Sequence, residues 1–359
     1  MVYRRSTRHA LVVGLVTVLG LCLGSAWACA DETLAQGRLE VFQAADGATY
    51  FAAVMPRIPQ ESPSGPRHIV VLVNTSAAQT GAVREKSRAA LKAFLGRLSD
   101  QDRVQIIAVD LKAVALGEGF AAVGSPELDA AVSKLEKRVP LGSCDFGAGL
   151  AAATEALKQA PAEGRVLMYF GDGLSRANVL SAETLSQLLT GLVDNKIPVS
   201  AYLIGTQVDF GLVASLATHT GGQLVVDSGD LDAAAVGERL SDAVRATVAF
   251  PNGAAWSEQV AEVYPSRMPP LRSDRETVAV GTLKNPGTVE VEVRSDRGSQ
   301  KFVFNGQPHP QNGFLVKLVE TARNNAGLVV PVPGADTLLQ LAENAELGVY
   351  NLTELARQA

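Results

Sequence analysis

The stretch HIVVLVNTSAA, residues 68–78, joins a short apolar run directly to a polar loop. An apolar run of this length, rich in valine, is typical of a strand buried on both faces of a sheet. Similar runs recur at residues 104–109, 166–170 and 197–204. Between them, apolar residues repeat at helical spacing, as in residues 83–98. This alternation predicts an α/β fold, in which helices cover both faces of a doubly wound, mostly parallel sheet.

Polar loops stand where such a sheet would bind a ligand. In parallel sheets, ligands bind in the loops at the carboxyl ends of the strands. Three loops meet this condition: residues 74–78 after the first strand, residues 141–147 before a helix, and residues 171–175 after the strand at 166–170. We call the surface formed by these three loops the upper face, and we expect a binding site there.

The strand order, the helix placement and these loops resemble those of a von Willebrand factor type A domain over about residues 67–248. The segments around residues 50–56 and 263–269 resemble the flanks of that domain in inter-alpha-trypsin-inhibitor heavy-chain-like proteins and in secreted bacterial proteins. The resemblance implies a metal-ion-dependent adhesion site, at which a partner's carboxylate completes the coordination of the metal. Its pattern is D-x-S-x-S in the first loop, a Thr in the second and an Asp in the third.

Only part of that metal pattern is present. Ser76 and Asp172 match it. The pattern's Asp, second Ser and Thr are replaced by Asn74, Ala78 and Cys144. Magnesium prefers several oxygen ligands, and a sulfur ligand suits it badly. We therefore expect a degenerate metal site and no cofactor, with weak magnesium binding at most.

Two alternatives stay open for these loops. Asp145 could join Ser76, Asp172 and Asn74 as a ligand of a weakly bound magnesium ion. Alternatively, Asp172 accepts backbone N–H groups from the first loop and closes the site without an ion. In both cases we expect a partner-binding face formed by the following residues: Asn74, Thr75, Ser76, Cys144, Asp145, Asp172 and Gly173.

The composition excludes several other functions. The 359 residues carry 32 Lys and Arg against 37 Asp and Glu, and this acidic balance does not suit a nucleic-acid-binding protein. Four His and three Cys are too few for a disulfide framework or a zinc cage.

Catalysis by the Cys144 thiol is not expected. A reactive thiolate there would need an exposed position at a helix N-terminus and a nearby base, and neither His68 nor His219 is placed beside it. We therefore expect no enzymatic activity.

The sequence of the N-terminal segment predicts that the protein is exported from the cytoplasm. Three arginines precede an apolar run over residues 10–27, and Ala28-Cys29-Ala30 fits the pattern of a signal-peptide cleavage site. An uncleaved membrane anchor is the alternative, because the run is nearly long enough to span a bilayer. We expect a periplasmic, cell-envelope or secreted protein that is not inserted in the membrane once the signal is cleaved.

The chain divides by pattern into five segments. They are a signal peptide (1–30), a lead-in strand with a Pro/Ser-rich linker (31–66), the type A-like domain (67–248), a small antiparallel β unit (249–312) and a helical C-terminal segment (313–359). The function expected from these observations is non-catalytic recognition or adhesion of another protein through the upper face. Two alternatives are a metal-dependent adhesion module with weak magnesium binding and a structural scaffold in an envelope assembly.

Overall fold

The computed structural model describes residues 34–62 and 65–346. The signal peptide expected over residues 1–30 and the end of the expected C-terminal helix, residues 347–358, lie outside this part of the chain. Within the described ranges, no helix combines the length and the apolar character needed to cross a membrane.

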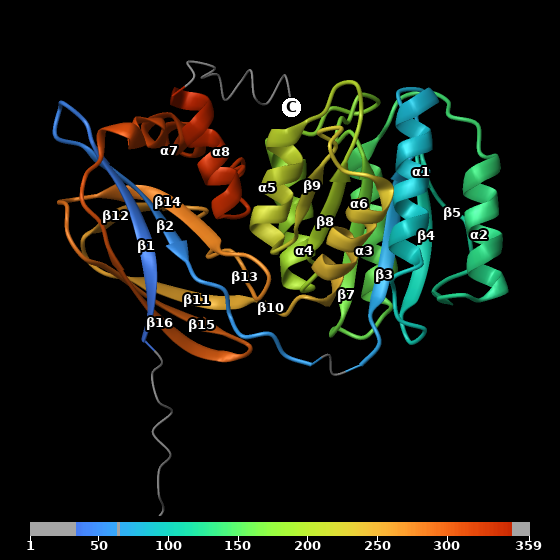
Figure 1. Cartoon of the computed structure of the whole chain (residues 1–359), viewed down its shortest axis with the longest axis horizontal. Helices are drawn as coiled ribbons and strands as arrows, with labels where there is room; N and C mark the ends of the chain where they lie inside the picture. Colours follow the sequence, from blue (N-terminus) through green and yellow to red (C-terminus); the bar gives the residue numbers. More distant parts are fainter. Residues whose placement is uncertain (1–33, 63–64, 347–359) are drawn as a thin grey trace, which may run out of the picture. The chain divides into compact units, whose positions relative to one another are not determined.

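The first sheet has the strand order β5-β4-β3-β7-β8-β9 (Figure 1). Strands β3, β4, β7, β8 and β9 pair in parallel, whereas β5 and the short β6 pair with β4 in antiparallel orientation. The strand bounds are β3 His68–Asn74, β4 Arg103–Val109, β5 Ala113–Ala115, β6 Ala121–Ala122, β7 Arg165–Gly171, β8 Val199–Leu203 and β9 Leu224–Val226.

Helices cover both faces of this sheet, because the central strands are apolar on both sides. Side chains of β3 alternate between two cores: Ile69 packs with α1, α2 and α6, and Val70 packs with α3, α4 and α5. The expected doubly wound α/β fold is therefore confirmed. The helix bounds are α1 Gly81–Leu95, α2 Pro126–Lys137, α3 Phe146–Lys158, α4 Ala182–Asp194, α5 Phe210–Thr220 and α6 Ala233–Arg245.

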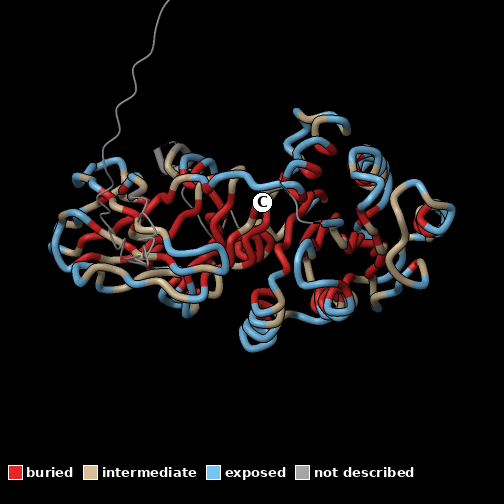
Figure 2. The backbone as a smooth tube through the Cα atoms, turned by 90° about the horizontal axis from the view of Figure 1, so that it is seen from below, coloured by how far each residue is buried: buried red, intermediate tan, exposed pale blue. Residues whose placement is uncertain are grey.

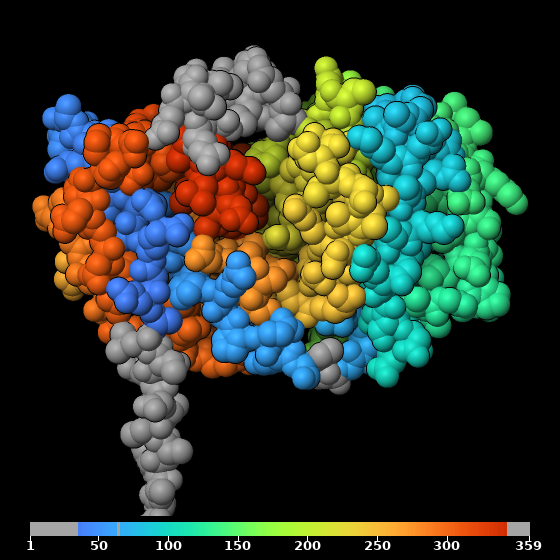
Figure 3. Space-filling model, in the orientation of Figure 1, coloured from blue at the N-terminus to red at the C-terminus, as the bar shows by residue number. Residues whose placement is uncertain are grey.

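Helices α1 and α6 lie side by side on one of these faces (Figure 3). Gly237 of α6 permits the close approach, since a Cβ atom there would lie 2.7 Å from the Cβ of Ala93 in α1. Figure 2 shows the resulting layers, with buried backbone inside and exposed residues on the outer sides of the helices.

A second sheet has the strand order β11-β15-β16-β1-β2-β14-β12. Ring contacts show that this sheet folds over itself, because Trp256 of β11 lies 6.2 Å from Phe51 of β2, four strands away. Helices α7 and α8 cover its other side. The bounds are β1 Leu34–Gln43, β2 Thr49–Met55, β11 Pro251–Trp256, β12 Val260–Tyr264, β14 Thr277–Leu283, β15 Val289–Ser295, β16 Gly298–Asn305, α7 Phe314–Asn324 and α8 Ala335–Glu346. Three short elements lie outside this sheet: β10 Val248–Ala249, β13 Leu271–Arg272 and the 3₁₀ turn Pro310–Gly313.

The lead-in segment, expected to stand apart from the β unit at 249–312, contributes two strands to the middle of this second sheet. Strand β1 pairs with β16, and β2 pairs with β14 from Thr49↔Leu283 to Met55↔Thr277. Every residue of β2 is buried. The sequence pattern showed an apolar run here but could not show that one of its two partner strands, β14, lies more than 200 residues away.

Two buried arginines, Arg272 in β13 and Arg275 in the segment between β13 and β14, bind the α/β domain. Arg272 donates hydrogen bonds from Nη1 to the carbonyl oxygen of Gly221 (2.6 Å) and from Nη2 to that of Ala243 (3.0 Å). Arg275 donates from Nη2 to the carbonyl oxygen of Gly222 (2.8 Å). These carbonyls belong to the C-terminal ends of α5 and α6, where the helix dipole favours a positive charge. The arginines therefore satisfy helix ends that are buried between the two sheets.

Candidate functional site

The carboxyl ends of β3 and β7 bring three of the expected site residues together. Asn74 donates a hydrogen bond from Nδ2 to Oδ1 of Asp172 (2.9 Å). Its Oδ1 accepts the backbone N–H of Ser76 (2.9 Å). All three residues are buried, with 2–3% of their surface exposed. The first and third loops thus meet through an amide–carboxylate contact.

Both carboxylate oxygens of Asp172 accept hydrogen bonds. Oδ1 also accepts the backbone N–H of Leu174 (3.0 Å), and Oδ2 accepts Nε2 of Gln79 (3.4 Å). The expectation that backbone N–H groups of the first loop donate to Asp172 is wrong, because the donors are the side-chain amides of Asn74 in that loop and of Gln79 just after it, together with the backbone N–H of Leu174 in the third loop. Nothing in the local sequence pattern singles out Gln79, because the burial of its amide just before α1 is decided by the fold.

Burial raises the pKa of Asp172, and this effect outweighs the hydrogen bonds from Leu174, Gln79 and Asn74, which lower it. The folded protein therefore retains the proton at pH values where the unfolded chain has lost it. The contribution of Asp172 to stability is complete at low pH and falls as the pH rises through this interval.

We expect an Asp172→Asn variant to gain stability relative to wild type as the pH rises from about 4 to about 7, because its amide cannot ionise. The measurement is the free energy of unfolding in urea at several pH values. Asp129→Asn, which removes a carboxylate at an exposed position on α2, is the control. Parallel pH curves for Asp172→Asn and Asp129→Asn would contradict the prediction.

The second loop places Cys144 in the core rather than at the surface. Its side chain is buried, and this burial raises the pKa of the thiol, with the charges of Asp172 and Asp145 adding to the effect. His68 begins β3 and so lies at the end of the sheet opposite the loop, while His219 contacts the carbonyl oxygen of Leu328. The thiol is therefore protonated at neutral pH, and neither histidine is positioned to activate it.

Asp145 turns away from Asp172. Its Oδ1 accepts the backbone N–H of Ala148 and caps α3 (2.9 Å). Its Oδ2 accepts Nδ2 of Asn178, which follows the third loop (2.5 Å). Both carboxylate oxygens of Asp145 therefore accept hydrogen bonds that hold the loops and the start of α3 in place. The expectation that Asp145 replaces a missing metal ligand does not match this geometry.

The two remaining expected residues have other neighbours. Thr75 Oγ1 contacts Oδ2 of Asp110 (3.2 Å) and accepts Nε of Arg138 (3.0 Å). Gly173 has a φ angle of 73°, and a Cβ atom there would lie 2.5 Å from Cγ2 of Val213. Thr75 therefore belongs to an ion-pair network beside α2, and Gly173 lets the third loop approach α5.

The donor set does not suit a magnesium ion. Such an ion needs several free oxygens in octahedral arrangement. Here Asn74 presents its N–H group to Asp172, Ala78 offers no side-chain oxygen, and Cys144 offers a protonated thiol. Among the described residues, no group of three or more His, Cys, Asp or Glu side chains could hold a metal.

Aliphatic side chains are exposed around these loops. Leu111, Val139 and Leu141 are each at least 60% exposed. Leu141 is tied to the first loop, because its N–H donates to the carbonyl oxygen of Thr75 (3.3 Å). Exposed aliphatic groups that lie beside polar loops are typical of protein-interaction surfaces.

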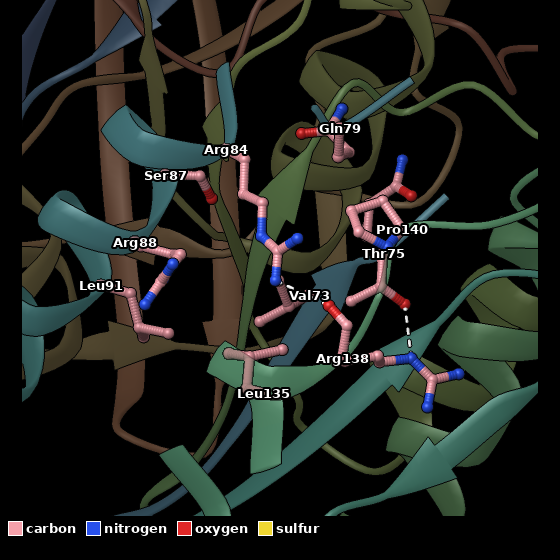
Figure 4. A pocket seen from close by; sticks show the side chains of 11 residues that line it. Val73, Thr75, Gln79, Arg84, Ser87, Arg88, Leu91, Leu135, Arg138 and Pro140 are labelled. Atoms are coloured by element: carbon pink, nitrogen blue, oxygen red, sulfur yellow. Dashed lines mark hydrogen bonds between the residues drawn. The ribbon is translucent and has the colours of Figure 1, made fainter. Parts of the chain in front are cut away.

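A small cavity of about 30 Å³ opens beside the first loop (Figure 4). Its lining combines side chains from the first loop, α1 and the C-terminal end of α2. The arginines Arg84, Arg88 and Arg138 are part of it. No sequence pattern singles out Arg84 and Arg88, because they are two of several charged residues on α1.

Comparisons with known proteins support the fold. Residues 67–226 match the family model of the von Willebrand factor type A domain. No functionally curated protein matches the sequence significantly. A solved von Willebrand factor type A structure from Catenulispora acidiphila is similar with a TM-score of 0.50 and 13% identity, over 82% of this chain and 81% of its own.

Two further solved structures are similar at lower scores. The ArnB paralog VWA2 from Sulfolobus acidocaldarius has a TM-score of 0.47 and 13% identity, over 87% of this chain and 88% of its own. The pilus adhesin SpaC from Lactobacillus rhamnosus GG, in its open conformation, has a TM-score of 0.40 and 12% identity, over 76% of this chain and 47% of its own. At these identities the similarity concerns the fold alone.

Proposed function

Because residues 67–226 of this chain form a von Willebrand factor type A domain, we propose that the protein recognises another protein through its upper face, without a metal ion and without catalysing a reaction. Type A domains commonly mediate protein–protein interaction. The observation that carries the metal-independent form of the proposal is the Asp172 carboxylate, both of whose oxygens accept N–H groups of Asn74, Leu174 and Gln79.

The surface around the site supports recognition of a protein. Leu111, Val139 and Leu141 are exposed, with Leu111 against Gly142 and Leu141 bonded to Thr75, and polar groups of the loops bond to one another. A partner that covers these aliphatic side chains would gain roughly 25 cal/mol for each Å² of apolar surface removed from water. Loop shape and hydrogen bonds would then supply the specificity that a metal supplies in other type A domains.

The proposal also places the protein outside the cytoplasm. The basic N-terminus, the apolar run and the Ala28-Cys29-Ala30 pattern support export to the periplasm, the cell envelope or the medium. An envelope extract is therefore the appropriate source of partners.

We expect the immobilised protein to retain the same envelope proteins in EDTA and in millimolar magnesium, and its melting temperature to change by less than about 1 °C between them. Leu141→Asp should reduce the retained amount at least about tenfold, because a charge would replace an apolar contact in the interface. Leu339→Asp is the matched control, since Leu339 is also an exposed leucine but lies on α8. It should leave retention unchanged.

Two results would contradict the proposal. Retention or thermal stability that depends on magnesium would favour the metal-dependent alternative. Retention that is equally insensitive to Leu141→Asp and Leu339→Asp would favour a structural scaffold over recognition through the upper face.

A further inference from the structure

Arg84 projects from α1 into the cavity beside the first loop (Figure 4). Its Nη2 donates to two backbone carbonyl oxygens at the C-terminal end of α2, those of Glu136 (2.9 Å) and Arg138 (2.6 Å). These bonds hold the guanidinium in one place, and its Nε and Nη1 groups take no part in them. The cation is therefore positioned but retains donor capacity.

Arg84 differs from the other two arginines of the cavity in its counter-charge. Arg88 pairs with the Glu136 carboxylate (3.1 Å), and Arg138 pairs with Asp110 (2.7 Å). Among residues 34–62 and 65–346, no carboxylate lies within ion-pair distance of Arg84. The guanidinium of Arg84 binds backbone carbonyl groups of α2 instead of a carboxylate, so it can form an ion pair with an added anion.

The size and the walls of the cavity define the kind of group it would accept. A volume of about 30 Å³ holds a single small group, not a whole ligand molecule. Ser87 adds a hydroxyl, while Leu91, Leu135 and Pro140 form apolar walls. A carboxylate with one or two methylene groups matches this combination, because the charge would meet Arg84 while the methylenes contact the apolar walls.

We propose that Arg84 receives an aspartate or glutamate side chain of the partner protein, so that a fixed guanidinium takes the place of the metal as the group that binds a partner's carboxylate. This inference rests on the proposed function. The partner segment would carry aliphatic residues next to the acid. The reason is that Pro140 lines the cavity, and its two sequence neighbours, Val139 and Leu141, are both exposed.

The test uses two capped tripeptides, acetyl-Val-Asp-Leu-amide and acetyl-Val-Asn-Leu-amide, titrated into the uniformly ¹⁵N-labelled protein in EDTA. We expect the aspartyl peptide to shift the amide signals of Ser87 and Leu141 with half-saturation at low-millimolar concentration. The asparaginyl peptide should bind at least about tenfold more weakly, which corresponds to roughly 1.4 kcal/mol.

Variants of Arg84 distinguish the loss of its positive charge from a loss of folding. Arg84→Gln should abolish the shifts, and Arg84→Lys, which keeps the charge, should retain them with an affinity within about tenfold of wild type. Arg239→Gln, an exposed arginine on α6, is the matched control and should bind as wild type does. Unchanged amide signals in the core strands would show that each variant remains folded.

The possible failures are distinguishable. Equal binding of the two peptides, no binding of either, or unchanged binding by Arg84→Gln would overturn the role of Arg84 and leave recognition through the upper face to the envelope-retention experiment. Binding that appears only when magnesium replaces EDTA would overturn both this inference and the metal-independent form of the proposed function.

Discussion

The Arg272→Ala variant is expected to unfold with a free energy about 3–5 kcal/mol below that of wild type. The Arg272 side chain is fully buried, and it pairs with Asp274 through two hydrogen bonds of 2.6 Å each. It also donates to the carbonyl oxygens of Gly221 and Ala243. Its removal would leave a partly buried carboxylate and two helix-end carbonyls without their donor, and unpaired buried groups of this kind are costly.

The measurement is urea-induced unfolding followed by circular dichroism. Arg294→Ala is the matched control, because Arg294 lies on β15 with 60% of its side chain exposed and only a 3.9 Å contact to Glu292. An exposed pair of this kind contributes about 0–1 kcal/mol, so the control should stay close to wild type. Equal unfolding midpoints for the two variants would show that the hydrogen bonds of the buried arginine to α5, α6 and Asp274 do not contribute to stability.

The Asn74→Asp variant, which restores the first carboxylate of the metal pattern, is expected to lose about 2–4 kcal/mol of stability at neutral pH. Its new oxygen would lie where Asn74 Nδ2 now donates to Asp172, 2.9 Å from that carboxylate. Two buried carboxylates at this distance cannot both ionise at ordinary cost, so the folded pair retains a proton that the unfolded chain releases. The stability of the variant should therefore fall as the pH rises, and its deficit should shrink toward about pH 5.

Millimolar magnesium should recover part of this deficit, because the introduced carboxylate, together with Asp172 and Ser76, would offer the ion a set of oxygen donors. Asn74→Ala is the control. It loses the hydrogen bond to Asp172 without adding a second carboxylate, so its deficit should grow less with pH than that of Asn74→Asp and should not respond to magnesium. If Asn74→Asp and Asn74→Ala were equally stable at neutral pH, the side chains at positions 74 and 172 would not face each other as the structure has them.

The architecture of the type A domain was predictable because its signals are local. In the stretch from His68 to Asn74, consecutive apolar residues require burial on both faces, and only a central strand between two layers of helices provides that. The cap at Ser125 and the start of α2 at Pro126 follow from the same kind of local chemistry. The positions of Asn74, Ser76 and Asp172 at the carboxyl ends of neighbouring strands then follow from the parallel sheet.

The directions of the site's side chains were not predictable. The sequence placed Asp145 beside Cys144 but not its oxygens against Ala148 and Asn178. It gave no sign that Gln79 would reach Asp172, or that Arg84 would lack a carboxylate partner among the described residues. Each of these facts depends on rotamers and neighbours contributed by other elements, and spacing along one segment does not report them.

By itself, the sequence determined the α/β alternation and the loops that form the upper face, and it has Asn74, Ala78 and Cys144 where the resemblance to the family implies an Asp, a Ser and a Thr. Tertiary structure alone decided that β1 and β2 complete a sheet with strands more than 200 residues later, and that Arg272 of β13 donates to the C-terminal ends of α5 and α6. The physical reason is the same in both cases. Hydrophobic periodicity shows that a face must be buried, but the partner that buries it is chosen by packing between distant parts of the chain.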